Sequence, residues 1–262
     1  MAVQARLLDP GGCPWDREQT HESLRTYLLE ETYEVLEALE AKDFRKLPDE
    51  LGDLLLQIVF HSELARREGK FEIGDVIEHI HNKMVRRHPH VFGDAQADDA
   101  KAVLKNWEQL KAEERKAAGK AEASGSLLEG IPKTLPATLE AFQLTRRASR
   151  IGFDWERLEG VLDKLKEEVA ELRAAAEKGA REHMEEEIGD LLFVAVNVAR
   201  FLETDPELAL RAANAKFKKR FEWMEREAER GGRKLAEVPR EEMERLWERA
   251  KVADAREGGG RA

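Results

Sequence analysis

A pattern of carboxylates occurs twice in this chain with the same internal spacing. In each copy, two glutamates three positions apart are followed by the pattern Glu-x-x-Asp. The first glutamate of the copy lies 19 residues before the glutamate of Glu-x-x-Asp, and the second copy lies 137 positions after the first. The eight acids are Glu31, Glu34, Glu50 and Asp53, and then Glu168, Glu171, Glu187 and Asp190. Acids at i and i+3 share one helix face, so two such helices packed together would gather four carboxylates. Such a cluster predicts ligands for a hard divalent cation, Mg²⁺ or alternatively Mn²⁺.

One more acid precedes the first ligand of each copy, Glu30 in the first and Glu167 in the second. Single glutamates are common on solvated helix faces, but repetition of the whole spacing favours a duplicated site. The extra acids lie about 100° round the helix from the first ligand. They could bind a second ion, orient a water molecule or simply face solvent.

Basic and aromatic residues recur in the same order after each set of acids. Lysine and arginine at i, i+3 and i+4 can reach one side of a helix and bind phosphate, although bases near a helix C-terminus also complement its dipole. A tryptophan further along could stack on a nucleobase or pack in the core. The residues concerned are Lys83, Arg86, Arg87 and Trp107, and then Lys216, Lys219, Arg220 and Trp247.

A histidine-based metal site is a competing interpretation. Helical di-iron bundles use Glu-x-x-His pairs, and the first half contains Glu18-x-x-His21 and Glu78-x-x-His81. The second half has only His183 and neither pair, although its four acids are intact. Whatever chemistry the repeat performs therefore does not require histidine.

Composition predicts an all-α protein. Leu, Ala, Glu, Lys and Arg dominate, aromatic residues are 6%, and no apolar stretch approaches the roughly 20 residues of a membrane span. The net charge of −10 argues against a generic nucleic-acid or membrane surface. The single cysteine, Cys13, excludes an intrachain disulfide and makes the cytoplasm the expected compartment.

Apolar periodicity and breakers predict two tandem helical-bundle repeats. We expect domains at 1–116 and 135–256, a linker at 117–134 and a disordered tail at 257–262. The near-continuous apolar run from Leu54 to Phe60 should be buried on most sides. Helices are expected at 18–42, 51–67, 73–87, 107–116, 136–150, 157–178, 182–203, 206–230 and from 239 onward.

Three motifs together resemble one known family, the tandem-domain MazG nucleoside triphosphate pyrophosphohydrolases. They are the duplicated acids, the segment Cys13-Pro14-Trp15-Asp16 with His21, and the run Arg86-Arg87-His88-Pro89-His90-Val91-Phe92-Gly93-Asp94. The likeness covers nearly the whole chain apart from linker and tail. It implies the all-α NTP pyrophosphatase fold and a homodimer whose subunits complete each other's bundles. It also implies Mg²⁺-dependent hydrolysis of a broad range of NTPs to NMP and pyrophosphate, with an activated water attacking the α-phosphorus.

Carried across residue by residue, the resemblance makes all eight acids metal ligands. It places Lys164, Glu168, Glu186, Lys216 and Arg220 around the nucleotide, with Trp247 near the base. Lys83, Arg87 and Trp107 would take corresponding places in the first repeat. Glu167 or Glu186, and Glu30 in the first repeat, are the candidate general bases.

One position departs from the family pattern. His183 stands where relatives commonly have a lysine near the phosphates, so triphosphate binding there should be weaker or differ in pH dependence. Base and sugar preference, the division of work between the repeats and the physiological role stay open. The alternative function is a nucleotide-sensing or interaction protein that binds metal without turnover.

Overall fold

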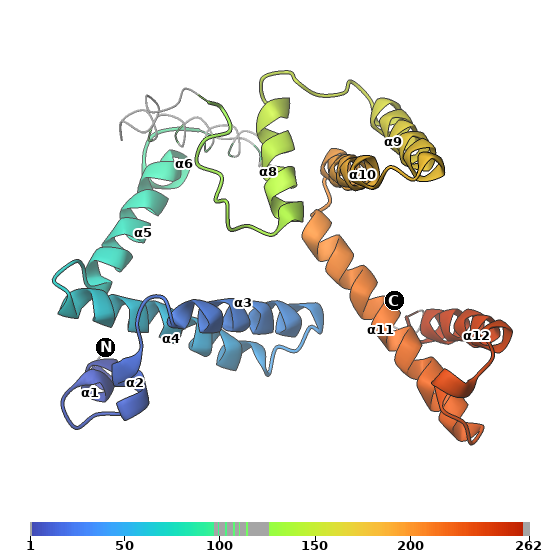
Figure 1. Ribbon diagram of the computed structural model, residues 1–262. Coiled ribbons are helices and arrows are strands. Elements are labelled where there is room, and N and C mark those ends of the chain that lie inside the picture. Colours follow the sequence, from blue (N-terminus) through green and yellow to red (C-terminus); the bar gives the residue numbers. More distant parts are fainter. Residues whose placement is uncertain are drawn as a thin grey trace. The chain divides into compact units, whose positions relative to one another are not determined.

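The computed structural model describes residues 2–96, 99, 103, 107, 110, 114 and 126–258, with side chains as far as 255. Within these residues all regular secondary structure is helical, which confirms the all-α prediction (Figure 1). The chain divides into two compact units, Met1–Ala123 and Ser124–Ala262. Half of the predicted linker and most of the polar helix at 107–116 lie outside the described residues, so the domain boundaries stay a prediction.

The first unit is organised around a helical hairpin. Helices α3 and α4 pack along each other, and the short α1 packs against α4 (Figure 1). Leu8, Leu24 and Phe60 form the buried core where these elements meet. The helices are α1 (Ala2–Leu8), α2 (Pro14–Glu18), α3 (Leu24–Glu40), α4 (Leu47–Arg67), α5 (Ile73–Arg87) and α6 (Pro89–Phe92).

The second unit repeats the hairpin with α9 and α10. Gly179 ends α9 at a φ of 67°, the left-handed conformation that glycine adopts without steric cost. Helix α8 packs against α10 and α11, and α11 packs against α12 around Met224, Leu246 and Ala250. The elements are α8 (Ala137–Ser149), α9 (Leu158–Lys178), α10 (Arg181–Phe201), α11 (Pro206–Arg230), the 3₁₀ turn η1 (Leu235–Glu237) and α12 (Arg240–Gly258).

Helix ends differ from the predicted ones where side chains compete for backbone groups. Helix α3 begins at Leu24 rather than 18, because Thr20 and Ser23 bond each other's backbone N–H through their hydroxyls. The last helix reaches Gly258, two residues into the predicted tail, and the rest of the tail lies outside the described residues.

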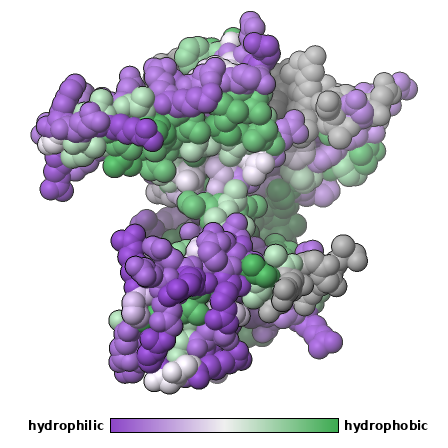
Figure 2. All heavy atoms as spheres, turned by 90° about the vertical axis from the view of Figure 1, so that its right-hand side faces the viewer, coloured by the Kyte–Doolittle hydropathy of each residue, from purple (hydrophilic) through white to green (hydrophobic). Residues whose placement is uncertain are grey.

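The expectation that the apolar run in α4 is buried on most sides is wrong for the single chain. Leu55 is 56% exposed, and Leu192, its equivalent in α10, is 62% exposed. A two-helix hairpin covers only one side of each helix, and Phe60 is the member of this run that reaches the core. Figure 2 shows hydrophobic side chains gathered in surface bands between hydrophilic ones. Exposed apolar side chains gathered in this way require an explanation.

One ion pair stabilises the turn that precedes α9. Both carboxylate oxygens of Asp154 accept hydrogen bonds from Arg200 of α10, at 2.9 and 2.5 Å. The guanidinium holds the pKa of Asp154 below its ordinary value of 3.8. A lowered folded-state pKa contributes stability above the unfolded-state value, and this stability is lost as the pH falls through the folded-state pKa.

Replacing Asp154 by Asn is therefore expected to lower the free energy of unfolding at pH 7 by about 1–3 kcal/mol. The deficit should shrink progressively below about pH 4, because the wild-type carboxyl is then protonated too. Urea unfolding of both proteins at pH 7 and in steps down to pH 2.5 checks this, at fixed ionic strength. A deficit of the same size at every pH would contradict it.

Candidate active site

The acids of the first repeat come together between α3 and α4. Glu31 on α3 and the pair Glu50 and Asp53 on α4 each place a carboxylate oxygen within 4.8 Å of the other two. Glu34, one helical turn after Glu31, lies close enough to Glu50 for that carboxylate to raise the pKa of Glu34. The structure thus gathers all four predicted ligands at one place on the hairpin.

The second repeat forms a similar cluster between α9 and α10. Here Glu168, Glu171 and Glu187 each offer an oxygen within 4.8 Å of the others. Asp190 is not one of these three, but its charge contributes to raising the pKa of Glu187. The group of three acids within this distance therefore differs between the repeats, although the eight acids occupy equivalent sequence positions.

Crowding makes these clusters electrostatically unfavourable when no cation is bound. Burial raises the pKa of Glu31, and the charges of Asp53, Glu34 and Glu50 raise it further. In the second repeat burial likewise raises the pKa of Glu187, followed by the charge of Glu171. A divalent cation removes this repulsion, and an all-oxygen ligand set suits Mg²⁺ or Mn²⁺. The residues present therefore fit the predicted ion.

Each cluster has one deeply buried acid, and a lysine accompanies it. Glu50 is 5% exposed with Lys46 Nζ 2.7 Å away, and Glu168 is 3% exposed with Lys164 Nζ 2.8 Å away. A buried carboxylate without a counter-charge would be costly. Lys164 also contacts Glu167 at 2.7 Å.

Lys46 is a neighbour of the site that the sequence analysis missed. It lies 137 residues before His183, so the register of the repeats could have identified it. The two equivalent residues make different contacts. Lys46 contacts the buried Glu50, whereas His183 Nδ1 lies 3.1 Å from Glu186 Oε2, and the side chains of His183 and Glu186 are mostly exposed. Glu30, the remaining candidate base, is exposed on α3.

The histidines of the first half do not join either acid cluster. His21 stacks on His61 of α4, with 2.8 Å between their Nδ1 atoms, and His81 lies beside Asn82. Among the described residues, the groups of acids and histidines close enough to share a metal contain no histidine. This geometry gives the di-iron interpretation no support.

The basic and aromatic residues pair in both repeats. The guanidinium carbon of Arg87 lies 5.6 Å from the ring centre of Trp107, and that of Arg220 lies 6.0 Å from the ring centre of Trp247. Both distances suit a cation–π contact. Lys83 and Lys216 each precede their arginine, Arg87 or Arg220, by four residues on the same helix, so they lie about one turn away.

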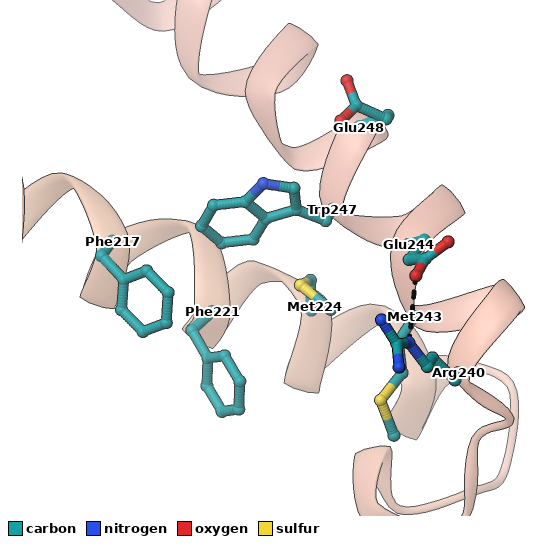
Figure 3. A pocket seen from close by; sticks show the side chains of 8 residues that line it. All are labelled: Phe217, Phe221, Met224, Arg240, Met243, Glu244, Trp247 and Glu248. Atoms are coloured by element: carbon teal, nitrogen blue, oxygen red, sulfur yellow. Dashed lines mark hydrogen bonds and ion pairs between the residues drawn. The ribbon is translucent and has the colours of Figure 1, made fainter. Parts of the chain in front are cut away.

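A cavity of about 490 Å³ lies between α11 and α12 beside Trp247. The indole lies directly beside Phe217, with 5.3 Å between the two ring centres, and Phe221 follows one turn further along α11 (Figure 3). The walls are mainly apolar, and the charged pair Arg240 and Glu244 lies at one side. The remaining lining residues are Met224, Met243 and Glu248. Sequence patterning did not predict this cavity, because it depends on how α12 crosses α11.

The family model for the MazG nucleotide pyrophosphohydrolase domain matches residues 19–92 and again residues 157–224. The chain belongs to the MazG family. Each match contains one complete acid cluster and the basic residues of that repeat that were predicted to bind phosphate. The MazG resemblance and the tandem organisation are thereby confirmed.

Curated MazG relatives extend over almost the whole chain. The "Nucleoside triphosphate pyrophosphohydrolase/pyrophosphatase MazG" of Thermotoga maritima is 46% identical over 97% of this chain and 95% of its own length. The "Nucleoside triphosphate pyrophosphohydrolase" of Escherichia coli is 45% identical over 96% of this chain and 95% of its own. The "Uncharacterized protein YabN" of Bacillus subtilis is 44% identical over 97% of this chain but only 51% of its own.

Proposed function

We infer that this chain is a nucleoside triphosphate pyrophosphohydrolase that cleaves an NTP into NMP and pyrophosphate. The observation that carries this inference is the duplicated gathering of carboxylates, each inside a segment that matches the MazG domain. Two relatives named for this activity align with nearly the full chain. A cluster of acids in a protein of net charge −10 would repel a triphosphate, so it suits this substrate only through bound cations.

The cations are proposed to be Mg²⁺, with Mn²⁺ as a substitute, held by the eight acids of the two clusters. When bound, such an ion neutralises phosphate charge and makes a coordinated water more acidic. Glu167 and Glu186 are the proposed bases that orient the attacking water in the second repeat, and Glu30 is the base in the first. Lys164 and His183 contact Glu167 and Glu186 and so hold these carboxylates next to the ligands.

The basic residues and tryptophans are proposed to hold the nucleotide. Lys216 and Arg220, with Lys83 and Arg87 in the first repeat, would bind phosphate oxygens. Trp247 and Trp107 would stack on the base. The apolar cavity beside Trp247 offers ring faces rather than a set of fixed hydrogen bonds, which favours broad base specificity.

Product analysis tests the reaction. With ATP, Mg²⁺ and water enriched in ¹⁸O, we expect AMP and pyrophosphate, with the label in the AMP phosphate because the α-phosphorus is attacked. EDTA should stop the reaction. Release of ADP and phosphate would contradict the proposed reaction. Nucleotide binding without any product would instead establish the alternative, a nucleotide sensor without turnover.

The assembly is proposed to be a homodimer of this chain. Equivalent apolar residues of α4 and α10 are exposed in the single chain, among them Leu55 and Leu192. A second copy can cover both faces with the same surfaces, as a two-fold interface requires. Among the described residues, no helix is long and apolar enough to cross a membrane. The single cysteine supports a cytoplasmic location, and the negative net charge supports a protein without nucleic-acid or membrane partners.

A further inference from the structure

An acid on the last helix holds the arginine that faces Trp247. Asp254 of α12 accepts hydrogen-bonding contacts from Arg220 of α11, with Nε and Nη2 both 2.9 Å from Oδ2. Lys219 Nζ lies 2.9 Å from the other oxygen. The Arg220 and Asp254 side chains are 20% and 19% exposed, so water only partly screens them.

The first repeat contains the same arrangement. Glu114 accepts from Nε of Arg87 at 3.2 Å and from Nη2 at 2.5 Å, while Arg86 Nη2 lies 2.7 Å from it. Glu114 follows Trp107 by seven residues, as Asp254 follows Trp247, and the two acids are 140 positions apart. Each repeat therefore has one acid that accompanies the same set of residues: a tryptophan, an arginine and a second basic residue. Neither was singled out from the sequence.

The contact fixes the direction of the guanidinium. In both repeats the acid engages the edge formed by Nε and Nη2, while the guanidinium carbon lies 5.6 Å (Arg87) or 6.0 Å (Arg220) from the centre of the indole ring. An arginine side chain has several rotatable bonds, and holding it in one orientation before ligand binding removes an entropic cost of binding. Each acid faces two basic side chains of its own repeat. The Arg87 and Arg86 contacts hold the pKa of Glu114 at about 2, so the carboxylate stays charged at neutral pH.

We propose that Asp254 and Glu114 are positioning residues that hold Arg220 and Arg87 against their tryptophans in the orientation that binds the nucleotide. This inference rests on the proposed function, in which these arginines bind the phosphates. The acids touch the arginines and not the reacting atoms. Their loss should therefore weaken substrate binding more than it slows the chemical step.

The test combines Asp254→Asn with Glu114→Gln in the full chain, so that it applies whichever repeat is active. Both substitutions keep the side-chain shape and remove the charge. We expect KM for ATP to rise about tenfold, the equivalent of one charge-assisted hydrogen bond, with kcat within about twofold of wild type. Exchanging the acids, Asp254→Glu with Glu114→Asp, should restore most of the affinity because each repeat uses one of the two.

Glu227 provides a matched control between the same two helices. It contacts Arg249 at 3.0 Å, and Arg249 lies 5.4 Å from the ring centre of Trp223; none of these three residues is assigned to the nucleotide. Glu227→Gln should leave KM unchanged. If it raised KM as much as the paired acid substitutions, Asp254 would merely join α11 to α12 and the proposal would be overturned.

Arginine variants separate this inference from the proposed function. Arg220→Ala with Arg87→Ala should raise KM, and adding the acid substitutions should then have no further effect. An unchanged KM in the acid variant, or an effect that persists without the arginines, would overturn the positioning role while leaving the nucleotide site intact. An unchanged KM in the arginine variant would overturn the nucleotide assignment and the inference with it. Calorimetric titration of ATP with Ca²⁺ in place of Mg²⁺ gives a second measure of affinity.

Discussion

Removing charge from both acid clusters is expected to abolish nucleotide hydrolysis. The variant carries Glu50→Gln and Asp53→Asn together with Glu187→Gln and Asp190→Asn. Each pair removes two of the ligands proposed for the cation, whose charge neutralisation and water activation account for most of the rate. We expect a loss of at least about 10³-fold in pyrophosphate release, measured with ATP and Mg²⁺.

Each half of this variant measures the contribution of one repeat. Changing only the α4 pair or only the α10 pair, with a panel of canonical, deoxy and modified NTPs, shows how activity and specificity divide between them. Glu159→Gln with Glu177→Gln is the matched control, because it removes two exposed charges from α9 outside the cluster. Full turnover in the fourfold variant would refute the metal-site assignment.

The α10 half of this variant, Glu187→Gln with Asp190→Asn, should unfold at a higher temperature than wild type when EDTA is present. Burial and then the charges of neighbouring acids raise the pKa of Glu187, so removing its charge relieves repulsion in the metal-free state, whereas the α4 half would also break the Lys46–Glu50 pair. Adding Mg²⁺ should stabilise wild type more than this variant. Differential scanning calorimetry measures both effects independently of turnover.

Introducing charge on the exposed apolar faces is expected to convert a dimer into single chains of 29.9 kDa. Leu55→Glu and Leu192→Glu are equivalent changes, since the positions are 137 residues apart. Burying each leucine in an interface contributes roughly 1.5–3 kcal/mol, and burying a carboxylate there costs several more. The dimer dissociation constant should therefore rise at least about 100-fold.

Sedimentation velocity across a range of protein concentrations measures this dissociation. Ile151→Glu is the control, because Ile151 is 62% exposed but lies in the turn after α8 rather than on a hairpin helix. A single-chain mass for the wild-type protein at micromolar concentration would rule out the homodimer. Helix content by circular dichroism shows whether the glutamate variants keep their fold.

Helices with strong local signals were well predicted from the sequence. Residues 73–87 were predicted and observed as one helix, Ile73–Arg87, because apolar periodicity ends where His88 precedes Pro89. Helix α4 begins four residues before the predicted start at 51. Asp43 accepts from the backbone N–H groups of Arg45 and Lys46, which sets the chain up for a helix at Leu47.

Local periodicity also located the acids, because spacing along a helix determines which side chains share a face. It did not single out Lys46, Glu114 or Asp254, whose importance lies in contacts with other side chains, although the register of the repeats pairs Lys46 with His183. It also overestimated the burial of Leu55, since an apolar stretch shows that a face needs covering but not which surface covers it.

The sequence by itself determined the helical class, the tandem repeat and the types of residue available for metal and phosphate. These properties follow from composition and from spacing along single helices. Only the tertiary structure decided which carboxylate is deeply buried in each cluster, which lysine accompanies it and which acid orients each arginine. These contacts join residues through helix packing, and the crossing of two helices is set by the side chains of both.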